Sequence, residues 1–160
     1  GEQNEWIGLG LSNAPNARVG GFWGLGFGGI VDDDAPPVIS PAWIPFAEGD
    51  APATVQLPFD LSAPSGKTVT VNWSTIDIPS NPALASSSNG DFTAASGTLT
   101  FPPGVTRQHA TINIRADTAP EGDEYLVVVP SAPANATIGG LFGLGVVLIA
   151  DDDPAPGAGP

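Results

Sequence analysis

The sequence contains no cysteine and no methionine, and among its 160 residues only four are Lys or Arg and one is His. Without cysteine, the fold is not a disulfide scaffold and Cys–His catalysis is excluded. Seventeen acidic residues bring the net charge to −13. Nucleic acid and anionic membrane surfaces attract basic patches, so neither is expected as a partner. No apolar run approaches the length of a membrane-spanning helix, so direct membrane insertion is not expected either.

The single histidine limits the enzymatic mechanisms that the chain can use. His109 lies in a stretch with strand-like alternation, and the phase of that alternation places it on the solvent face. A Ser-His-Asp arrangement would need this one histidine in a cleft. We therefore expect a protein that is not an enzyme.

Helix signals are scarce, whereas 18 prolines and 21 glycines interrupt the chain at short intervals. This rhythm is typical of an all-β sandwich. We expect Val38–Ala47 to be an edge strand because it contains Pro41 and Pro45. We also expect Trp43 and Trp73 to lie in the core. The sequence predicts a seven-stranded antiparallel immunoglobulin-like β-sandwich with strands at Val38–Ala47, Ala53–Leu61, Thr68–Thr75, Thr98–Phe101, Arg107–Arg115, Tyr125–Val129 and Ile138–Ala150.

One segment of the chain occurs twice. Glu2–Asp34 aligns without a gap with Glu121–Asp153 at an offset of 119, and 14 of the 33 aligned positions are identical. Repetition at a domain-sized spacing indicates tandem units. We predict that residues 1–34 are a β-hairpin, the C-terminal strand pair of a preceding repeat or a hairpin donated to another subunit. Residues 35–153 are then one complete domain, and residues 154–160 a Pro/Gly linker or tail.

The acidic residues are clustered, and only Asp50, Asp60 and Asp91 lie outside the clusters. Three consecutive aspartates, Asp151–Asp153, repel one another unless a cation neutralises them. Calcium takes six to eight oxygen ligands, several of them carboxylates. Strand direction alternates, so carboxylates on the first strand, after the third, before the sixth and after the seventh fall at one end of the sandwich. A solvated acidic linker is the alternative explanation.

The order of several motifs resembles the Calx-beta domains of sodium–calcium exchangers and bacterial surface proteins. The resemblance covers residues 35–153, and residues 1–34 as a partial copy. The motifs are Ala47–Asp50, Leu61–Gly66, Val69–Trp73, Gly90–Phe92, Ser96–Gly104, Ile112–Asp117, Pro120–Tyr125, Asn135–Gly139 and Asp151–Asp153. The resemblance implies Ca²⁺ as the cofactor and a ligand set of Glu48, Asp77, Asp117, Glu121, Glu124, Asp151, Asp152 and Asp153.

The chain departs from the family pattern at two places. Asp77 is followed by a long uncharged loop, and Ala116 stands where calcium-binding members carry a second aspartate. Fewer carboxylates predict fewer ions or weaker binding, in the millimolar range of extracellular modules.

Taken together, the sequence predicts a calcium-stabilised structural repeat of an extracellular or cell-surface array, a stalk or adhesin spacer. Its partners would be neighbouring repeats or identical subunits, and a glycan or host-surface ligand stays open. One alternative is an extracellular filament subunit joined by strand donation through residues 1–34. Others are a calcium-sensing regulatory domain and a carbohydrate-binding module, which would need an exposed aromatic platform.

Overall fold

Two separate groups of strands make up the chain, one within Gly1–Ala35 and the other within Pro36–Pro160. The computed structural model describes residues 2–21, 24–77, 81, 83–87, 90–140 and 142–153. The predicted tail at 154–160, the pair at 22–23 and parts of the predicted loop at 78–90 lie outside the described residues. The described part of the chain contains no helix of the length and apolarity that a membrane crossing requires.

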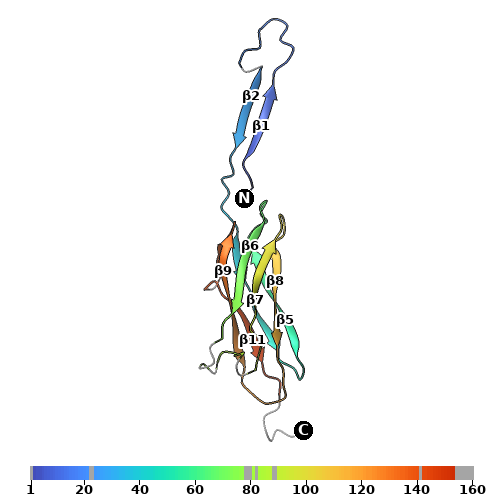
Figure 1. The fold of residues 1–160 in the computed structure, drawn as a ribbon, viewed down its shortest axis with the longest axis vertical. Helices are drawn as coiled ribbons and strands as arrows, with labels where there is room; N and C mark the ends of the chain where they lie inside the picture. Colours follow the sequence, from blue (N-terminus) through green and yellow to red (C-terminus); the bar gives the residue numbers. More distant parts are fainter. Residues whose placement is uncertain are drawn as a thin grey trace. The chain divides into compact units, whose positions relative to one another are not determined.

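Two sheets pack face to face in the second unit (Figure 1). A four-stranded sheet has the order β10-β3-β5-β8, and a five-stranded sheet has the order β4-β11-β9-β6-β7. The predicted all-β sandwich is confirmed. Its described strands are β3 (Val38–Pro41), β4 (Trp43–Ala47), β5 (Ala53–Leu61), β6 (Val69–Thr75), β7 (Ser96–Phe101), β8 (Arg107–Ile114), β9 (Glu124–Ala134), β10 (Thr137–Ile138) and β11 (Gly145–Ala150).

Alternation of apolar and polar residues along the strands fills the space between the sheets. In β5 the side chains of Val55, Leu57, Phe59 and Leu61 are buried, while the residues between them are more exposed. Successive side chains of a strand point to opposite faces, so one face of β5 lies against the core. The five-stranded sheet faces it with fully buried side chains of its own, among them Val69, Val71, Phe101, Leu126, Val128 and Val147.

The first predicted strand is divided between the two sheets. Ala42 connects β3 to β4, and it donates its N–H to Pro58 O of one sheet while accepting from Val146 N of the other. The edge prediction is correct for β4 and wrong for β3, which lies between β10 and β5. Because β10 pairs only with Val38 and Ile39, Pro41 still has a neighbouring strand on one side alone.

The last predicted strand is also divided, into β10 and β11. Gly140 and Gly143 adopt φ values of 93° and 65° between them, a conformation that glycine adopts without steric cost. Both divisions create parallel pairings, β10 with β3 and β11 with β4, whereas the other pairings of the sandwich are antiparallel. The described part of the sandwich therefore has nine strands where seven were expected.

The prediction that Trp43 lies in the core is wrong, whereas Trp73 is buried as expected. On β4 the partly buried side chains are Ile44 and Phe46, so the alternation turns Trp43 outward and leaves it 58% exposed. Trp43 lies next to Tyr125 along an apolar depression of about 240 Å³ on the outer face of the five-stranded sheet.

The first unit is an antiparallel hairpin of β1 (Glu5–Gly10) and β2 (Leu25–Ile30) (Figure 1). Its register joins Glu5 to Ile30 and Gly10 to Leu25. The side chains of Ile7, Leu9 and Phe27 are each at least half exposed.

Candidate metal centre

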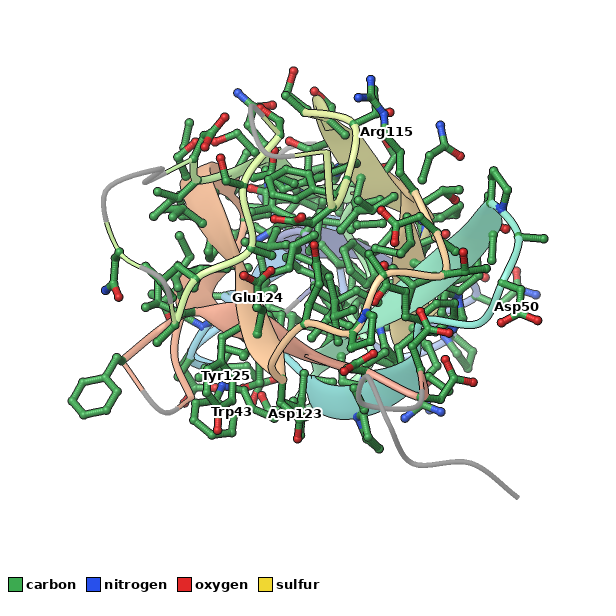
Figure 2. The ribbon with its side chains drawn as sticks, turned by 90° about the horizontal axis from the view of Figure 1, so that it is seen from below. Trp43, Asp50, Arg115, Asp123, Glu124 and Tyr125 are labelled. Atoms are coloured by element: carbon green, nitrogen blue, oxygen red, sulfur yellow. The ribbon has the colours of Figure 1, made fainter. Side chains whose placement is uncertain are left out.

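Acidic residues from four separate loops converge at one end of the sandwich. This is the end at which β4 and β11 finish and β9 begins, and Figure 2 views it with Glu124 toward the middle and Asp50 and Asp123 nearer the rim. The contributing residues are Glu48 after β4, Asp91 between β6 and β7, Asp117 and Glu121 between β8 and β9, Glu124 at the start of β9, and Asp151–Asp153 after β11.

Three of these carboxylates already lie at ligand spacing. One oxygen from each of Asp91, Glu121 and Glu124 lies within 4.8 Å of the other two. Calcium–oxygen distances are about 2.3–2.6 Å, so two oxygens on one ion are at most about 5 Å apart. The three oxygens therefore meet the distance condition for ligands of one calcium ion.

Glu48 is a buried carboxylate in this cluster, with a relative exposure of 9%. Burial, followed by the charges of Glu121, Asp117, Asp151 and Asp91, raises the pKa of Glu48 from 4.5 to about 7. Burial disfavours an isolated charge, and like charges disfavour it further. A cation among these groups would reverse both effects.

Burial and neighbouring negative charges act on Glu124 in the same way. Burial, then the charge of Asp91 and a hydrogen bond to it, raises the pKa of Glu124 to about 7. Burial first, and then the neighbouring aspartates, also raises the pKa of Glu121 and that of Asp153. The charged neighbours with the largest effects on these groups are all carboxylates, so the site has a strong excess of negative charge.

Backbone N–H groups fix the orientation of the aspartates after β11. Asp151 accepts hydrogen bonds from Glu121 N at 3.0 Å and from Asp153 N at 3.0 Å, one on each carboxylate oxygen. Asp152 Oδ1 accepts from Gly49 N at 2.9 Å and so connects the aspartate run to the turn after β4. These contacts connect the aspartate run to the loop before β9 and to the turn after β4.

Asp77 stands apart from the other predicted ligands. Its carboxylate accepts hydrogen bonds from the hydroxyls of Ser86, at 2.8 Å, and of Ser87. These two bonds hold the pKa of Asp77 below its usual value. The backbone N–H of Ser86 in turn donates to Asp91 Oδ2 at 2.5 Å. Asp77 is therefore connected to the cluster through Ser86, which donates to both Asp77 and Asp91, and not through direct contact of its own carboxylate oxygens.

Asp91 lies outside the ligand set that the sequence suggested, although it is 8% exposed and central to the cluster. In the sequence it is an isolated acid near the end of a long loop. The signal that could have identified it is its context, because Gly90 has a φ of 114° and Phe92 is fully buried. A glycine turn and an aromatic anchor on either side fix the backbone at Asp91.

The donor set suits a hard cation. The converging carboxylates offer oxygen ligands only. The single histidine, His109, lies on β8 opposite Pro58 of β5 and is not part of the cluster. Calcium prefers such oxygens, whereas zinc favours nitrogen and sulfur. Glu48, Asp91, Glu121 and Glu124 would hold the ion, with Asp117, Asp151 and Asp153 close by.

Comparison with known protein families gives one match. The Calx-beta domain family matches residues 39–153, which include every acidic residue of the cluster. The chain belongs to the Calx-beta family. This is a family of calcium-binding domains. A comparison with curated proteins gives no match.

Solved structures agree on the fold. The chain is 23% identical to the apo form of the Calx CBD1 domain, with a TM-score of 0.57 over 74% of this chain and 100% of that domain. It is 15% identical to the Calx CBD2 domain, with a TM-score of 0.56 over 72% of this chain and 86% of that one. CBD12 of CALX1.1, described as a calcium binding domain, is 23% identical with a TM-score of 0.58. This chain covers 46% of its length, and the match covers 72% of this chain.

Proposed function

We propose that the chain is a non-enzymatic, calcium-binding structural unit of an extracellular or cell-surface array. The observation that carries the proposal is the convergence of Glu48, Asp91, Glu121 and Glu124, of which Glu48 and Asp91 are buried. The charged groups that most affect the pKa values of Glu48, Glu121 and Glu124 are all carboxylates. A cluster of this kind destabilises the fold unless it binds cations.

Calcium would act here as a structural ligand that joins loops. One ion held by these residues would connect the end of β4, the loop before β7, the segment between β8 and β9 and the start of β9. Anything that binds the folded state and not the unfolded one increases stability. Glu2, Glu5 and Asp32–Asp34 repeat the acidic positions 121, 124 and 151–153, which favours a tandem arrangement with an acidic end to each unit. Ions at such ends would stiffen an array.

The proposal is tested by the melting temperature with about 10 mM calcium and with a chelator, alongside a sizing measurement. If the dissociation constant lies near 0.1–1 mM, saturation adds about 1.4–2.7 kcal/mol of stability. A rise of several degrees on a monomeric species supports the proposal. An unchanged melting temperature contradicts the calcium part and leaves Asp151–Asp153 as an acidic linker.

A second candidate function is a filament subunit joined by strand donation through residues 1–34. The exposed apolar side chains of β1 and β2 favour it. A polymer that forms equally with calcium and with chelator would support this candidate. A calcium-sensing regulatory domain is a further alternative, and binding in the micromolar range rather than the millimolar range would favour it.

A further inference from the structure

The hairpin of the first unit copies the pairing of β9 with β11. Five of its six cross-strand pairs, shifted by 119, are pairs of the sandwich: Glu5 with Ile30, for example, corresponds to Glu124 with Ile149. The connecting segments agree too, since Gly21 and Gly24 have φ values of 82° and 72°. Their counterparts, Gly140 and Gly143, have 93° and 65°.

The ends of the two hairpins carry the same hydrogen bonds. Asp32 N donates to Asn4 Oδ1 at 3.0 Å, as Asp151 N donates to Asp123 Oδ1 at 3.2 Å. The bond from Asp34 N to Asp32 Oδ1 likewise repeats that from Asp153 N to Asp151 Oδ1. The two hairpins are therefore alike in sequence, in strand register, in the glycine conformations of the connecting segment and in the hydrogen bonds at their open ends.

The faces of the two hairpins differ in what covers them. We call the side bearing Ile7, Leu9, Gly26, Gly28 and Ile30 the inner face, because its counterparts in β9 and β11 face the core. Ile7, Leu9 and Ile30 are 50%, 68% and 50% exposed, whereas the counterparts Leu126, Val128 and Ile149 are 0%, 0% and 4% exposed.

Two glycines indicate what the inner face is built to contact. A Cβ on Gly145 would lie 2.7 Å from Leu57 Cδ2 and 3.1 Å from Pro41 Cβ, so β5 and β3 require glycine there. Its counterpart Gly26 has nothing within 4 Å. In the same way a Cβ on Gly139 would lie 2.4 Å from Val38 Cγ1, while its counterpart Gly20 has open space. The described residues of the first unit bring no strand this close to Gly20 or Gly26, yet the glycines that would admit one are present.

We propose that the inner face of β1 and β2 docks on strands of the β3 and β5 type, as the final strand pair of a second sandwich of this same kind. A second copy of this chain is a poorer occupant, because its own β9 and β11 already fill that place between β4 and β6. The partner is therefore a sandwich that lacks its own last strand pair. This inference rests on the tandem part of the proposed function and not on its calcium part.

The test supplies those strands next to the intact chain. Pro36–Pro120 is fused directly before Glu2 of the full sequence, so that Glu2 takes the place of Glu121 in the added copy. Amide hydrogen exchange of residues 5–10 and 25–30 is then compared with that in the 160-residue chain. Docking into a core slows exchange of these amides by at least about 100-fold. Unchanged exchange overturns the proposal.

Two variants on one face of one strand make the test specific. Gly26→Val and Gly28→Val both place a side chain where the hairpin has open space. The counterpart of Gly28 is Val147, which is 0% exposed, so valine fits there, whereas the counterpart of Gly26 must be glycine. Gly26→Val is expected to abolish the added protection and Gly28→Val to keep it. Equal behaviour of the two variants contradicts the proposal.

Two further outcomes keep the alternatives apart. A concentration-dependent dimer of the 160-residue chain, with hairpin amides protected even in Gly26→Val, would overturn the proposal in favour of contact between copies. In the second outcome, the hairpin docks while calcium leaves the melting temperature unchanged. That result would support this inference and contradict the calcium part of the proposed function.

Discussion

Replacing Glu48 by glutamine should raise the stability of the calcium-free protein and reduce the stability that calcium adds. The carboxylate is buried among other acids, and its pKa rises from 4.5 to about 7 in the folded protein. A raised pKa means that the folded state holds the proton more tightly than the unfolded state does. The stabilisation of the folded state by the protonated Glu48 side chain is therefore complete below pH 4.5 and is lost as the pH rises through 7.

The size of the effect follows from the shift. A rise from 4.5 to about 7 corresponds to about 3 kcal/mol, which the calcium-free protein loses through Glu48 alone once this group ionises. Glutamine cannot ionise, so Glu48→Gln should be more stable than the parent at pH 8 without calcium, by up to about 3 kcal/mol. For a domain of this size that is roughly 10 °C in Tm. At pH 5 the two proteins should differ little.

Calcium should narrow the difference between the two proteins at pH 8. The ion stabilises the parent through the ionised carboxylate, and removal of one charged ligand should weaken binding by at least about tenfold. The assay is thermal unfolding of both proteins at pH 5 and pH 8, each with chelator and with about 10 mM calcium. In calcium at pH 8 the parent should show the larger gain in Tm.

Asp60→Asn provides the matched control. Asp60 lies away from the cluster and pairs with Arg107 at 2.6 Å, and its hydrogen bond to that side chain holds its pKa below the usual 3.8. The stabilisation that the Asp60 carboxylate gives the folded state is therefore present above pH 3.8 and is constant between pH 5 and pH 8. The same fall in Tm at both pH values is expected. If Glu48→Gln also lowered Tm equally at pH 5 and pH 8 without calcium, the reasoning on burial and repulsion would be refuted.

Three other changes test separate parts of the account. Asp91→Asn should weaken calcium binding by at least about tenfold in a calorimetric titration, since its oxygen lies with two others at ligand spacing, and unchanged affinity would remove it from the site. Asp77→Asn should weaken binding only about two- to fivefold, because it acts through Ser86; a loss as large as that of Asp91→Asn would make it a ligand. Gly145→Ala should destabilise the sandwich by about 1–3 kcal/mol in chemical denaturation, because the methyl would lie 2.7 Å from the core, whereas Gly122→Ala, in open space, should change stability by less than about 0.5 kcal/mol. Equal effects at the two glycines would contradict the packing argument.

Local patterns were sufficient to predict most of the sandwich. The alternation in Ala53–Leu61 specified a strand and its buried face, and both are present. The same logic failed at Trp43, because hydrophobicity suggested burial whereas the chain crosses between sheets at Ala42 and so sets the phase of β4. That crossing depends on hydrogen bonds to both sheets, which no local pattern contains.

The acidic site was predictable to the extent that its residues are clustered in sequence. Glu121, Glu124 and Asp151 stand near others of their kind and do lie together. Asp91 was missed because it is brought in by a loop whose conformation depends on contacts with distant residues, such as the bond from Arg115 N to Asp91 O. The position of Asp77 likewise depends on serines that the sequence does not single out.

The central claim is that these carboxylates hold calcium. The measurement that tests it most directly is calorimetric titration of calcium into the chelator-treated chain at pH 7.5, repeated with Asp91→Asn and with Asp60→Asn. We predict saturable binding with a dissociation constant at or below about 1 mM, with affinity weakened in Asp91→Asn and unchanged in Asp60→Asn. Absence of saturable heat, or the same affinity in all three proteins, would contradict it.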